Sequence, residues 1–275
     1  MKTLFIFIMA LAWSQCGFAQ QDSTLLSVTY EMKYKEYESD DTLKTDIRRL
    51  DIGRYSSQFI SAVSEWFEKT RGMYPPAEQR FHSPYPGSFT YRDDVFKNLP
   101  AKGIVSVVHM PGWLTVQDSL ATLFDWKPEK GDSTICGYPC KKATTSFRGR
   151  DWTVWYTMDL PYDDGPWKFC GLPGLILYAS ESDGVFSFSC IGIEKGDGHA
   201  ICMKYGKKLK VVTPERNEEL RIMEGKDKDA YFALITGFQV ISKKNYDSSG
   251  NPIQETPKKT VLMEYVKAGR QIERR

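Results

Sequence analysis

The stretch that decides the fold is DWTVWYTMDLPYDDGPWKFCGLPGLILYAS, residues 151–180. It begins and ends with runs that favour strands, and Gly and Pro interrupt its middle. Gly-Pro at 165–166 predicts one turn, and Leu-Pro-Gly at 172–174 predicts a type II turn in which Gly174 supplies the positive φ. The leucines around the second turn predict that it packs against other parts of the protein. We therefore expect two strands joined by the short aromatic bridge WKFC between two turns.

The first of these strands carries aromatic residues on both faces. Trp152 and Tyr156 fall on one face and Trp155 on the other, which predicts a central strand that is covered on both sides. The same period-2 alternation recurs in SVTYEMKYKEY near the N-terminus and in GVFSFSCIGI. We therefore expect a mainly β (α+β) fold, a single large curved antiparallel sheet with one or two helices. Helices laid on the concave side are one way to cover such a sheet.

Helices are predicted at two places. Residues 62–72 place apolar side chains on one helical face, and residues 214–235 follow Thr213, an N-cap residue, with Pro214 at the first helical position. Between them, residues 73–103 are rich in Pro and Gly and predict a long irregular segment of the kind that often carries function. A last pair of strands is expected after residue 236, and nothing indicates a second domain.

The first twenty residues, MKTLFIFIMALAWSQCGFAQ, have the layout of a secretory signal peptide. Lys2 supplies the positive end, an apolar stretch follows, and Gly17 and Ala19 form a small-x-small cleavage site. The apolar stretch is too short to span a bilayer as a helix. A lipidated Cys16 is the less favoured alternative, because no small-residue box precedes it. We expect residues 1–20 to be removed, and the mature protein to be periplasmic or secreted, with an outer-membrane association as the narrower alternative.

The charge balance excludes some classes of partner. The chain has 37 Lys and Arg against 35 Asp and Glu, a net charge of +2. A surface so close to neutral gives no electrostatic basis for binding nucleic acid or anionic lipid. Beyond the leader, no apolar run is long enough for a membrane-spanning helix, so we expect no transmembrane span in the mature chain.

Five cysteines remain after the leader, and in an exported chain they are first of all disulfide candidates. The residues around KGDG predict a hairpin that places Cys190 opposite Cys202, within disulfide reach. Cys136 and Cys140 flank the turn GYP and form the second predicted pair, which leaves Cys170 odd. The spacing C-x-x-x-C does not match the redox motif of thioredoxin-like proteins. We expect neither a metal nor a cofactor, because the three histidines show no paired spacing.

No pattern of a catalytic site stands out. The chain has no G-x-S-x-G elbow, no H-E-x-x-H and no Gly-rich phosphate loop. Asp159, Asp163 and Asp164 gather around one turn, where capping of the backbone is favoured over a calcium site. Paired acids from separate strands would still allow a hydrolase. Such an enzyme would be indicated by a deep pocket holding His82 or His109 beside a carboxylate.

The segment GRDWTVWYTMDLPYDDGPWKFCGLPGLIL, with ICGYPCKKATTSFRGR before it and more weakly LDIGRYSSQFIS near the N-terminus, resembles the GLPGLI family of exported proteins. The resemblance covers about residues 25–200 of a single domain at 21–275, and the extension 205–275 departs from it. It implies an envelope location, a largely β fold and no established activity. It also implies an association with TonB-dependent outer-membrane systems. A fainter similarity, through GYPCKKAT and the strand order around DLP, is to periplasmic lipoprotein carriers with an open half-barrel that holds an acyl chain.

The leading hypothesis is a non-catalytic exported binding or accessory protein, with an outer-membrane receptor or an apolar ligand as its partner. The alternatives are a periplasmic hydrolase and a carrier of hydrophobic ligands or lipoproteins. The expected contacts with the ligand or partner are Trp155, Trp167, Lys168, Leu172 and Pro173, and the expected turn residues are Gly165, Pro166, Gly171 and Gly174.

Overall fold

The computed structural model describes residues 22–35, 41–75, 78–85, 93–109, 114–203, 210–227 and 230–231. Twelve strands of this part form one sheet in the order β14-β7-β6-β5-β4-β3-β2-β12-β11-β10-β9-β8. Their bounds are β2 (Leu26–Tyr34), β3 (Lys44–Ile52), β4 (Ser57–Ser61), β5 (Asp93–Lys97), β6 (Ile104–His109), β7 (Leu114–Ser119), β8 (Lys127–Ile135), β9 (Tyr138–Phe147), β10 (Arg150–Thr157), β11 (Leu175–Glu181), β12 (Phe186–Lys195) and β14 (Lys210–Val212). Strands β1 (Asp22–Ser23) and β13 (Ala200–Ile201) form a separate two-stranded sheet.

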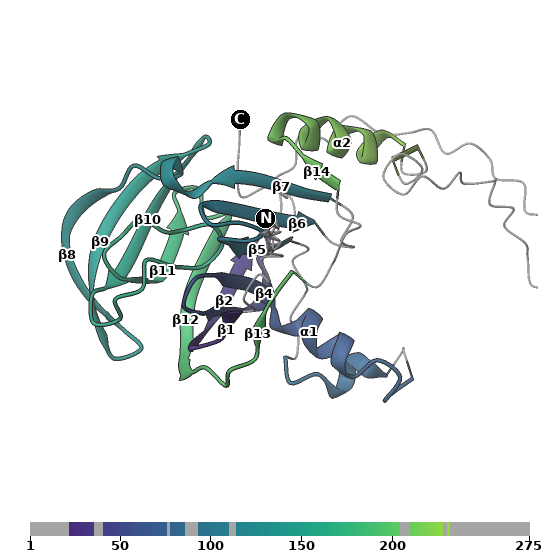
Figure 1. Ribbon diagram of the computed structural model, residues 1–275, viewed down its shortest axis with the longest axis horizontal. Coiled ribbons are helices and arrows are strands. Elements are labelled where there is room, and N and C mark those ends of the chain that lie inside the picture. Colours follow the sequence, from purple (N-terminus) through teal and green to yellow (C-terminus); the bar gives the residue numbers. More distant parts are fainter. Residues whose placement is uncertain are drawn as a thin grey trace, which may run out of the picture.

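The predicted fold class is confirmed. The sheet is large and curved, β8 and β14 are its edges, and α1 (Ala62–Lys69) and α2 (Pro214–Lys226) are the helices of the described residues (Figure 1). Two details differ from the prediction. Strand β14 pairs with β7 in parallel, whereas the remaining pairs are antiparallel. Strand β5 lies inside the segment 73–103 that Pro and Gly marked as irregular.

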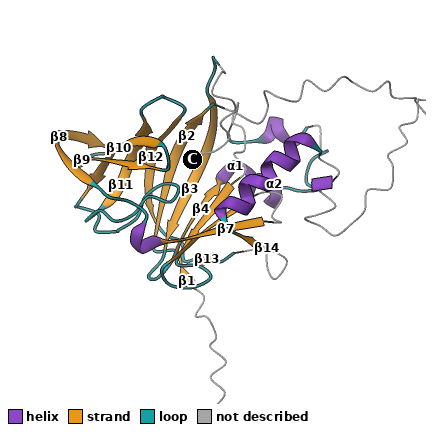
Figure 2. Cartoon of the chain, turned by 90° about the horizontal axis from the view of Figure 1, so that it is seen from above, coloured by secondary structure: helices purple, strands orange, loops and turns teal. Residues whose placement is uncertain are grey.

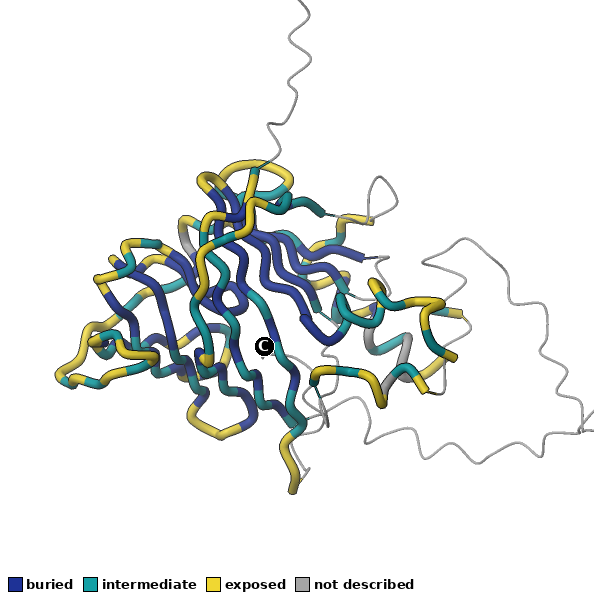
Figure 3. Tube along the Cα trace, turned by 90° about the horizontal axis from the view of Figure 1, so that it is seen from below, coloured by how far each residue is buried: buried dark blue, intermediate teal, exposed yellow. Residues whose placement is uncertain are grey.

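Alternation along the strands places one side of the sheet in the core. In β2 the buried residues Val28, Tyr30 and Met32 alternate with partly exposed ones, as the sequence predicts. The neighbouring β3 continues this face with Leu50 and Ile52, in register with Val28 and Leu26. Figure 3 shows buried stretches running along the strands, with exposed residues at the turns. We refer to this side of the sheet as the core face.

Helix α1 does not cover the core face. Ser61 caps α1 by accepting a hydrogen bond from the N–H of Ser64 at 3.1 Å. Glu65 of α1 pairs with Arg49 at 2.6 Å, and Arg49 alternates with core-face residues of β3. Helix α1 therefore lies on the opposite face, and both helices sit by the half of the sheet away from β8 to β10 (Figure 2).

Helix α2 begins where the sequence predicts. The side chain of Thr213 accepts a hydrogen bond from the N–H of Arg216 at 3.2 Å, and Pro214 is the first helical residue. Leu220 packs on Leu114 of β7 and fixes the helix beside this edge of the sheet. The predicted signal peptide with Cys16 and the last strand pair lie outside the described residues. Within the described residues, no helix is both long and apolar enough to cross a membrane.

Candidate functional site

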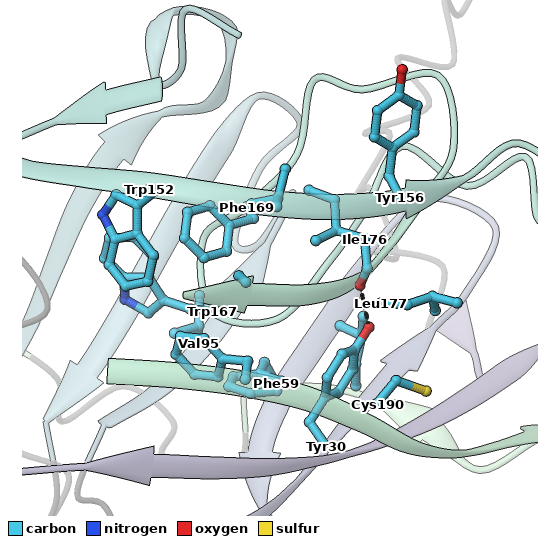
Figure 4. Packing of buried hydrophobic residues seen from close by; sticks show 14 of the residues in the cluster. Tyr30, Phe59, Val95, Trp152, Tyr156, Trp167, Phe169, Ile176, Leu177 and Cys190 are labelled. Carbon is cyan, nitrogen blue, oxygen red and sulfur yellow. Dashed lines mark hydrogen bonds between the residues drawn. The ribbon is translucent and has the colours of Figure 1, made fainter. Parts of the chain in front are cut away.

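The core face is covered by the chain itself, through residues 159–174 between β10 and β11, here called the core segment. All residues from 164 to 170 are buried. The ring centroid of Trp167 lies 5.9 Å from that of Trp152, and the ring of Phe169 lies 4.9 Å from Trp152 and 6.3 Å from Phe188. Figure 4 shows Phe169 and Trp167 next to Trp152 within the cluster. The aromatic bridge of the decisive stretch is thus the centre of the hydrophobic core.

Two buried lysines hold the core segment in place. Lys97 of β5 donates to the carboxylate of Asp164 and to the carbonyl oxygens of Gly165 and Phe169, the latter two at 2.6 and 2.9 Å. Lys97 is itself 3% exposed. Because one ammonium group satisfies three acceptors of the segment, it fixes the path of the backbone between the two turns.

The second lysine, Lys168, belongs to the segment and reaches outward to the sheet. Its Nζ lies 2.7 Å from Oδ2 of Asp118 in β7, and Arg148 lies 2.6 Å from the other oxygen. Burial raises the pKa of Asp118, but Lys168 and Arg148 outweigh burial and hold that pKa below its ordinary value. The segment is therefore tied to β5 and β7 at one side and to the Trp152 cluster at the other.

The turns of the segment differ from those predicted. The N–H of Gly174 bonds to the carbonyl oxygen of Leu172 at 2.8 Å, which closes a three-residue turn and not a type II turn. Gly174 has no positive φ; its need for glycine comes from space, since a Cβ there would lie 2.1 Å from the carbonyl oxygen of Thr157. Gly171 does have a positive φ, 92°, and so does Trp167, 52°.

The first turn is tight for a similar reason. A Cβ on Gly165 would lie 2.8 Å from Cβ of Ile176, and Pro166 accepts a hydrogen bond from the N–H of Phe169 at 3.1 Å. Asp164 accepts from the N–H of Gly165 at 2.7 Å. Asp163 accepts from the N–H of Gly171. The carboxylates of Asp163 and Asp164 thus cap backbone N–H groups of the turns, as the sequence indicates.

The five residues expected to contact a ligand or partner do not meet on one accessible surface. Trp167, Lys168 and Leu172 are buried among protein groups. Pro173 is exposed at the turn. Trp155 stands opposite Tyr178 and Lys142, on the face of the sheet away from the core. Spacing along the chain predicted a shared rim, but the alternation of β10 and the burial of the bridge separate these side chains.

A large accessible hollow lies elsewhere, at the end of the sheet where β3 turns into β4 and β5 into β6. It encloses about 820 Å³ and is lined by Asp22 and by residues 54–56, 98–102 and 201–203. We call it the end groove. Its volume falls in the range of small-molecule sites, about 300–1,000 Å³. Only its 98–102 wall lies in the segment that the sequence marked as a functional loop.

Asp22 shapes one wall of the end groove. Its carboxylate accepts hydrogen bonds from the N–H groups of Arg54, Tyr55 and Ser56 at 3.1, 2.7 and 2.8 Å. Burial raises the pKa of Asp22, but these donors outweigh burial and leave that pKa below its ordinary value. A Cβ on Gly53 would lie 2.5 Å from Oδ2 of Asp22, so glycine makes room for the carboxylate.

The remaining walls of the end groove combine apolar and cationic side chains. Leu99, Ile201 and Met203 contribute apolar surface, and Arg54 and Lys102 are exposed cations. The carboxylate of Asp22 already accepts hydrogen bonds from backbone N–H groups. A ligand in the groove would therefore meet an apolar wall beside positive charge.

The two histidines named as signs of a hydrolase have different surroundings. His82 stacks on Tyr74, with ring centroids 4.1 Å apart. His109 of β6 lies beside Asp93 of β5, with Nδ1 and Oδ1 2.6 Å apart. Neither histidine lines the end groove.

The five cysteines of the described residues are free thiols in this structure, and the placement of Cys190 and Cys202 corrects one of the predicted pairs. Cys190 of β12 stands opposite Tyr30 of β2, whereas Ala200–Ile201 pairs with β1. The hairpin that would place Cys190 opposite Cys202 is therefore wrong, because β2 and β1 occupy the expected partner positions. Cys136 lies at the tip of the β8–β9 hairpin, and its Sγ is 3.4 Å from Sγ of Cys190.

Comparison with known proteins gives a family without an assigned function. The model of a family described as "Protein of unknown function (Porph_ging)" matches residues 148–178. This range contains β10 and the core segment and is compatible with the resemblance to the GLPGLI family. No curated protein sequence matches the chain.

Three solved structures show distant similarity. The chain is 17% identical to PNGF-II with a TM-score of 0.47, covering 71% of this chain and 32% of PNGF-II, so it spans about a third of that protein. For MucB the identity is 12% and the TM-score 0.30, over 66% of this chain and 55% of MucB. A LolA superfamily protein from Nitrosomonas europaea is 8% identical with a TM-score of 0.26, over 65% and 88% of the two chains. None of these likenesses identifies a function.

Proposed function

We propose that the protein is an exported, non-catalytic binding protein of the cell envelope whose ligand occupies the end groove. The observation that carries this proposal is a hollow of about 820 Å³ with an apolar wall beside two cations. Export rests on the signal-peptide layout of residues 1–20. An accessory role beside a TonB-dependent outer-membrane receptor, which the family resemblance implies, is compatible with such a site.

The ligand class follows from the lining of the groove. Leu99, Ile201 and Met203 favour an apolar body, while Arg54 and Lys102 favour a carboxylate, sulfonate or phosphate group. Asp22 opposes an anion little, because three backbone N–H groups already neutralise its field. We infer a small amphipathic anion as the ligand.

A carrier of acyl chains within the concave side fits the structure less well. In this conformation the core segment fills the core face, with Trp167 and Phe169 packed against Trp152. An acyl chain would have to displace these rings and break the contacts of Lys97 with the segment. The end groove requires no such displacement.

The test is a fluorescence titration with anilinonaphthalene sulfonate, an amphipathic anion. We expect saturable binding by the wild-type chain, with an affinity at least about tenfold lower in the double variant Arg54→Glu/Lys102→Glu, since each reversal replaces attraction by repulsion. The matched control is Lys130→Glu, an exposed cation of β8 far from the groove in the sheet order.

The proposal predicts that Lys130→Glu binds like the wild type. Equal affinity in all three proteins would place the dye elsewhere and contradict a ligand site in the end groove. Circular dichroism spectra of the variants check that they are folded. Mass spectrometry of organic anions that co-purify with the protein from its native envelope would then identify the natural ligand.

A hydrolase remains the second candidate, favoured by the contact of His109 with Asp93. A carboxylate that orients an imidazole is one part of a nucleophile-activating arrangement. If this pair is catalytic, the wild-type chain hydrolyses p-nitrophenyl acetate above the uncatalysed rate. The His109→Ala variant then loses about 10²–10⁴-fold of that rate. An equal rate in wild type and variant excludes this candidate.

A further inference from the structure

Cys136 stands at the tip of the β8–β9 hairpin, in the turn itself. Ile135 pairs with Tyr138, so Cys136 and Gly137 are the two residues of a hairpin turn. Their φ angles are 50° and 84°, as a type I′ turn requires. A non-glycine residue with such a φ is uncommon, and Cys136 is held in it at an exposed tip.

Cys190, on the core face of β12, lies beside the tip of this hairpin. A β-bulge between Cys190 and Gly192 interrupts the pairing with β2. Ile191, within the bulge, points into solvent and is 54% exposed, whereas Cys190 is buried in the core cluster. Neighbouring residues of a strand point to opposite faces, so the thiol of Cys190 faces the core while Ile191 faces solvent.

The curl of the sheet brings the two thiols together. Strands β10 and β11 lie between β9 and β12, so in a flat sheet β9 and β12 would be about 14 Å apart, three strand spacings. That separation exceeds the Cα–Cα span of a disulfide. In the curved sheet the Sγ atoms of Cys136 and Cys190 are 3.4 Å apart, and Sγ of Cys136 is 3.2 Å from the carbonyl oxygen of Cys190.

The surroundings of the pair determine which thiol reacts first. Burial raises the pKa of Cys190 to about 12, and the neighbouring Cys136 adds to this. Burial likewise raises the pKa of Cys140, again with a contribution from Cys136. The exposed Cys136 is thus the thiol that an external reagent reaches first, and Cys190 is the thiol that reaches Cys136.

We propose that Cys136 and Cys190 form a disulfide in the oxidised protein, which clamps the curl of the sheet around the core segment. The Cys136 thiolate attacks one sulfur of an external disulfide, forms a mixed disulfide and releases one thiolate. The Cys190 thiolate then attacks Sγ of Cys136 and expels the second thiolate. The protein loses two protons and two electrons, and the external disulfide is reduced to two thiols.

Peptide mapping tests the link between Cys136 and Cys190. Each of these cysteines shares its tryptic peptide with a second cysteine, so fragmentation and serine variants are needed to assign the bond. Trypsin releases two peptides that each hold two cysteines: 131–141, with Cys136 and Cys140, and 169–195, with Cys170 and Cys190. The full-length protein is oxidised with oxidised glutathione, its remaining thiols are alkylated, and it is digested without reduction. The expected product joins the two peptides, and fragmentation of this product places the link at the two proposed residues.

Serine variants assign the link independently. The cross-linked product should persist in Cys140→Ser/Cys170→Ser and disappear in Cys136→Ser and in Cys190→Ser. Two results would overturn the proposal: alkylation of both Cys136 and Cys190 after oxidation, or a link within peptide 131–141, the pair that the sequence indicates.

The clamp also predicts a measurable change in stability, because the bond closes a long loop across four strands. A reductant should lower the melting temperature of oxidised Cys140→Ser/Cys170→Ser by roughly 5–15 °C. The same reductant should leave the melting temperature of Cys136→Ser unchanged. An equal response of both variants would show that the bond does not restrain the sheet.

Discussion

The core segment and the end groove are built from similar residue types with opposite results. Both are turns rich in Gly and Pro with a cation and aromatic or apolar neighbours. In the core segment Lys168 and Trp167 are almost fully buried, whereas at the end groove Lys102 and Tyr55 are exposed, Tyr55 by 59%. The difference lies in what faces each turn: the curled sheet closes over the first and leaves the second open.

This contrast shows that local composition does not distinguish a binding loop from a buried plug. The core segment has internal partners for its charges, Lys97 for Asp164 and Asp118 for Lys168. A buried charge that is fully partnered serves the fold, and a ligand would have to replace those partners. At the end groove, Arg54 and Lys102 remain at the surface, where a ligand can approach them without such a loss.

The largest effect expected on either region is that of Lys97→Ala. This change leaves the buried carboxylate of Asp164 without its cation and two carbonyl groups of the core segment without a donor. We expect a loss of about 3–5 kcal/mol in the free energy of unfolding, measured by urea titration. The control is Lys102→Ala at the end groove, with a change within about 0.5 kcal/mol. Similar losses of stability in both variants would contradict the proposed difference between the core segment and the end groove.

The next largest effect is expected at Gly174. It separates two reasons for which a position requires glycine: lack of space for a Cβ and a positive φ angle. Gly174→Ala should cost about 2–4 kcal/mol, because its Cβ would collide with the carbonyl group of Thr157 in β10. Gly184→Ala is the matched control: Gly184 has a φ of 68° and no atom near a Cβ. Its replacement should cost about 1 kcal/mol, the price of the left-handed conformation alone. Equal costs in thermal unfolding would argue against the close approach at Gly174.

Sequence reasoning identified the importance of Gly174 but not its cause. The Pro-Gly pair predicted a turn in a packed environment, and both features are present. The type II turn was wrong because the strand that Gly174 approaches, β10, requires a tighter three-residue turn. The local sequence around Gly174 cannot predict this close approach, because the backbone that Gly174 contacts, at Thr157, lies outside the turn.

Acid should weaken the attachment of the core segment through Asp118. Because the folded pKa of Asp118 lies below its ordinary value, its ion pairs contribute stability above a pH of about 4, and this contribution is lost as the pH falls through the folded pKa. Asp118→Asn should be less stable than the wild type at pH 7 and should show a shallower decline toward pH 2. Unfolding by urea at each pH measures both slopes.

The control for this titration is Asp132→Asn in β8. Asp132 pairs with Lys141, but both side chains are exposed, 80% and 54%, so solvent screens the pair. Its decline with acid should follow the wild type. If Asp118→Asn also follows the wild type, Asp118 does not anchor the segment.

The alternation of polar and apolar residues was enough to predict the mainly β fold and the buried face of β2, and the Thr-Pro pair at 213–214 was enough to predict the start of α2. It was not enough for the cysteines. Sequence reasoning paired Cys190 with Cys202 by symmetry about a turn, whereas β12 actually pairs with β2, which lies far earlier in the chain. The closeness of Cys136 to Cys190 depends on the curl across four strands, a property of the whole sheet.

The smallest effect on stability is expected at the end groove, and it gives the sharpest test of the comparison. Tyr55→Ala removes an exposed ring, so the free energy of unfolding should change by less than about 0.5 kcal/mol. Because Tyr55 lines the groove, the same change should weaken binding of anilinonaphthalene sulfonate by severalfold. The matched aromatic variant, Trp167→Ala in the core segment, should instead cost about 3–5 kcal/mol. If Tyr55→Ala lowers the free energy of unfolding but leaves dye binding unchanged, Tyr55 serves the fold and not a ligand. A residue that serves ligand binding should affect the affinity for the dye more than the stability of the free protein.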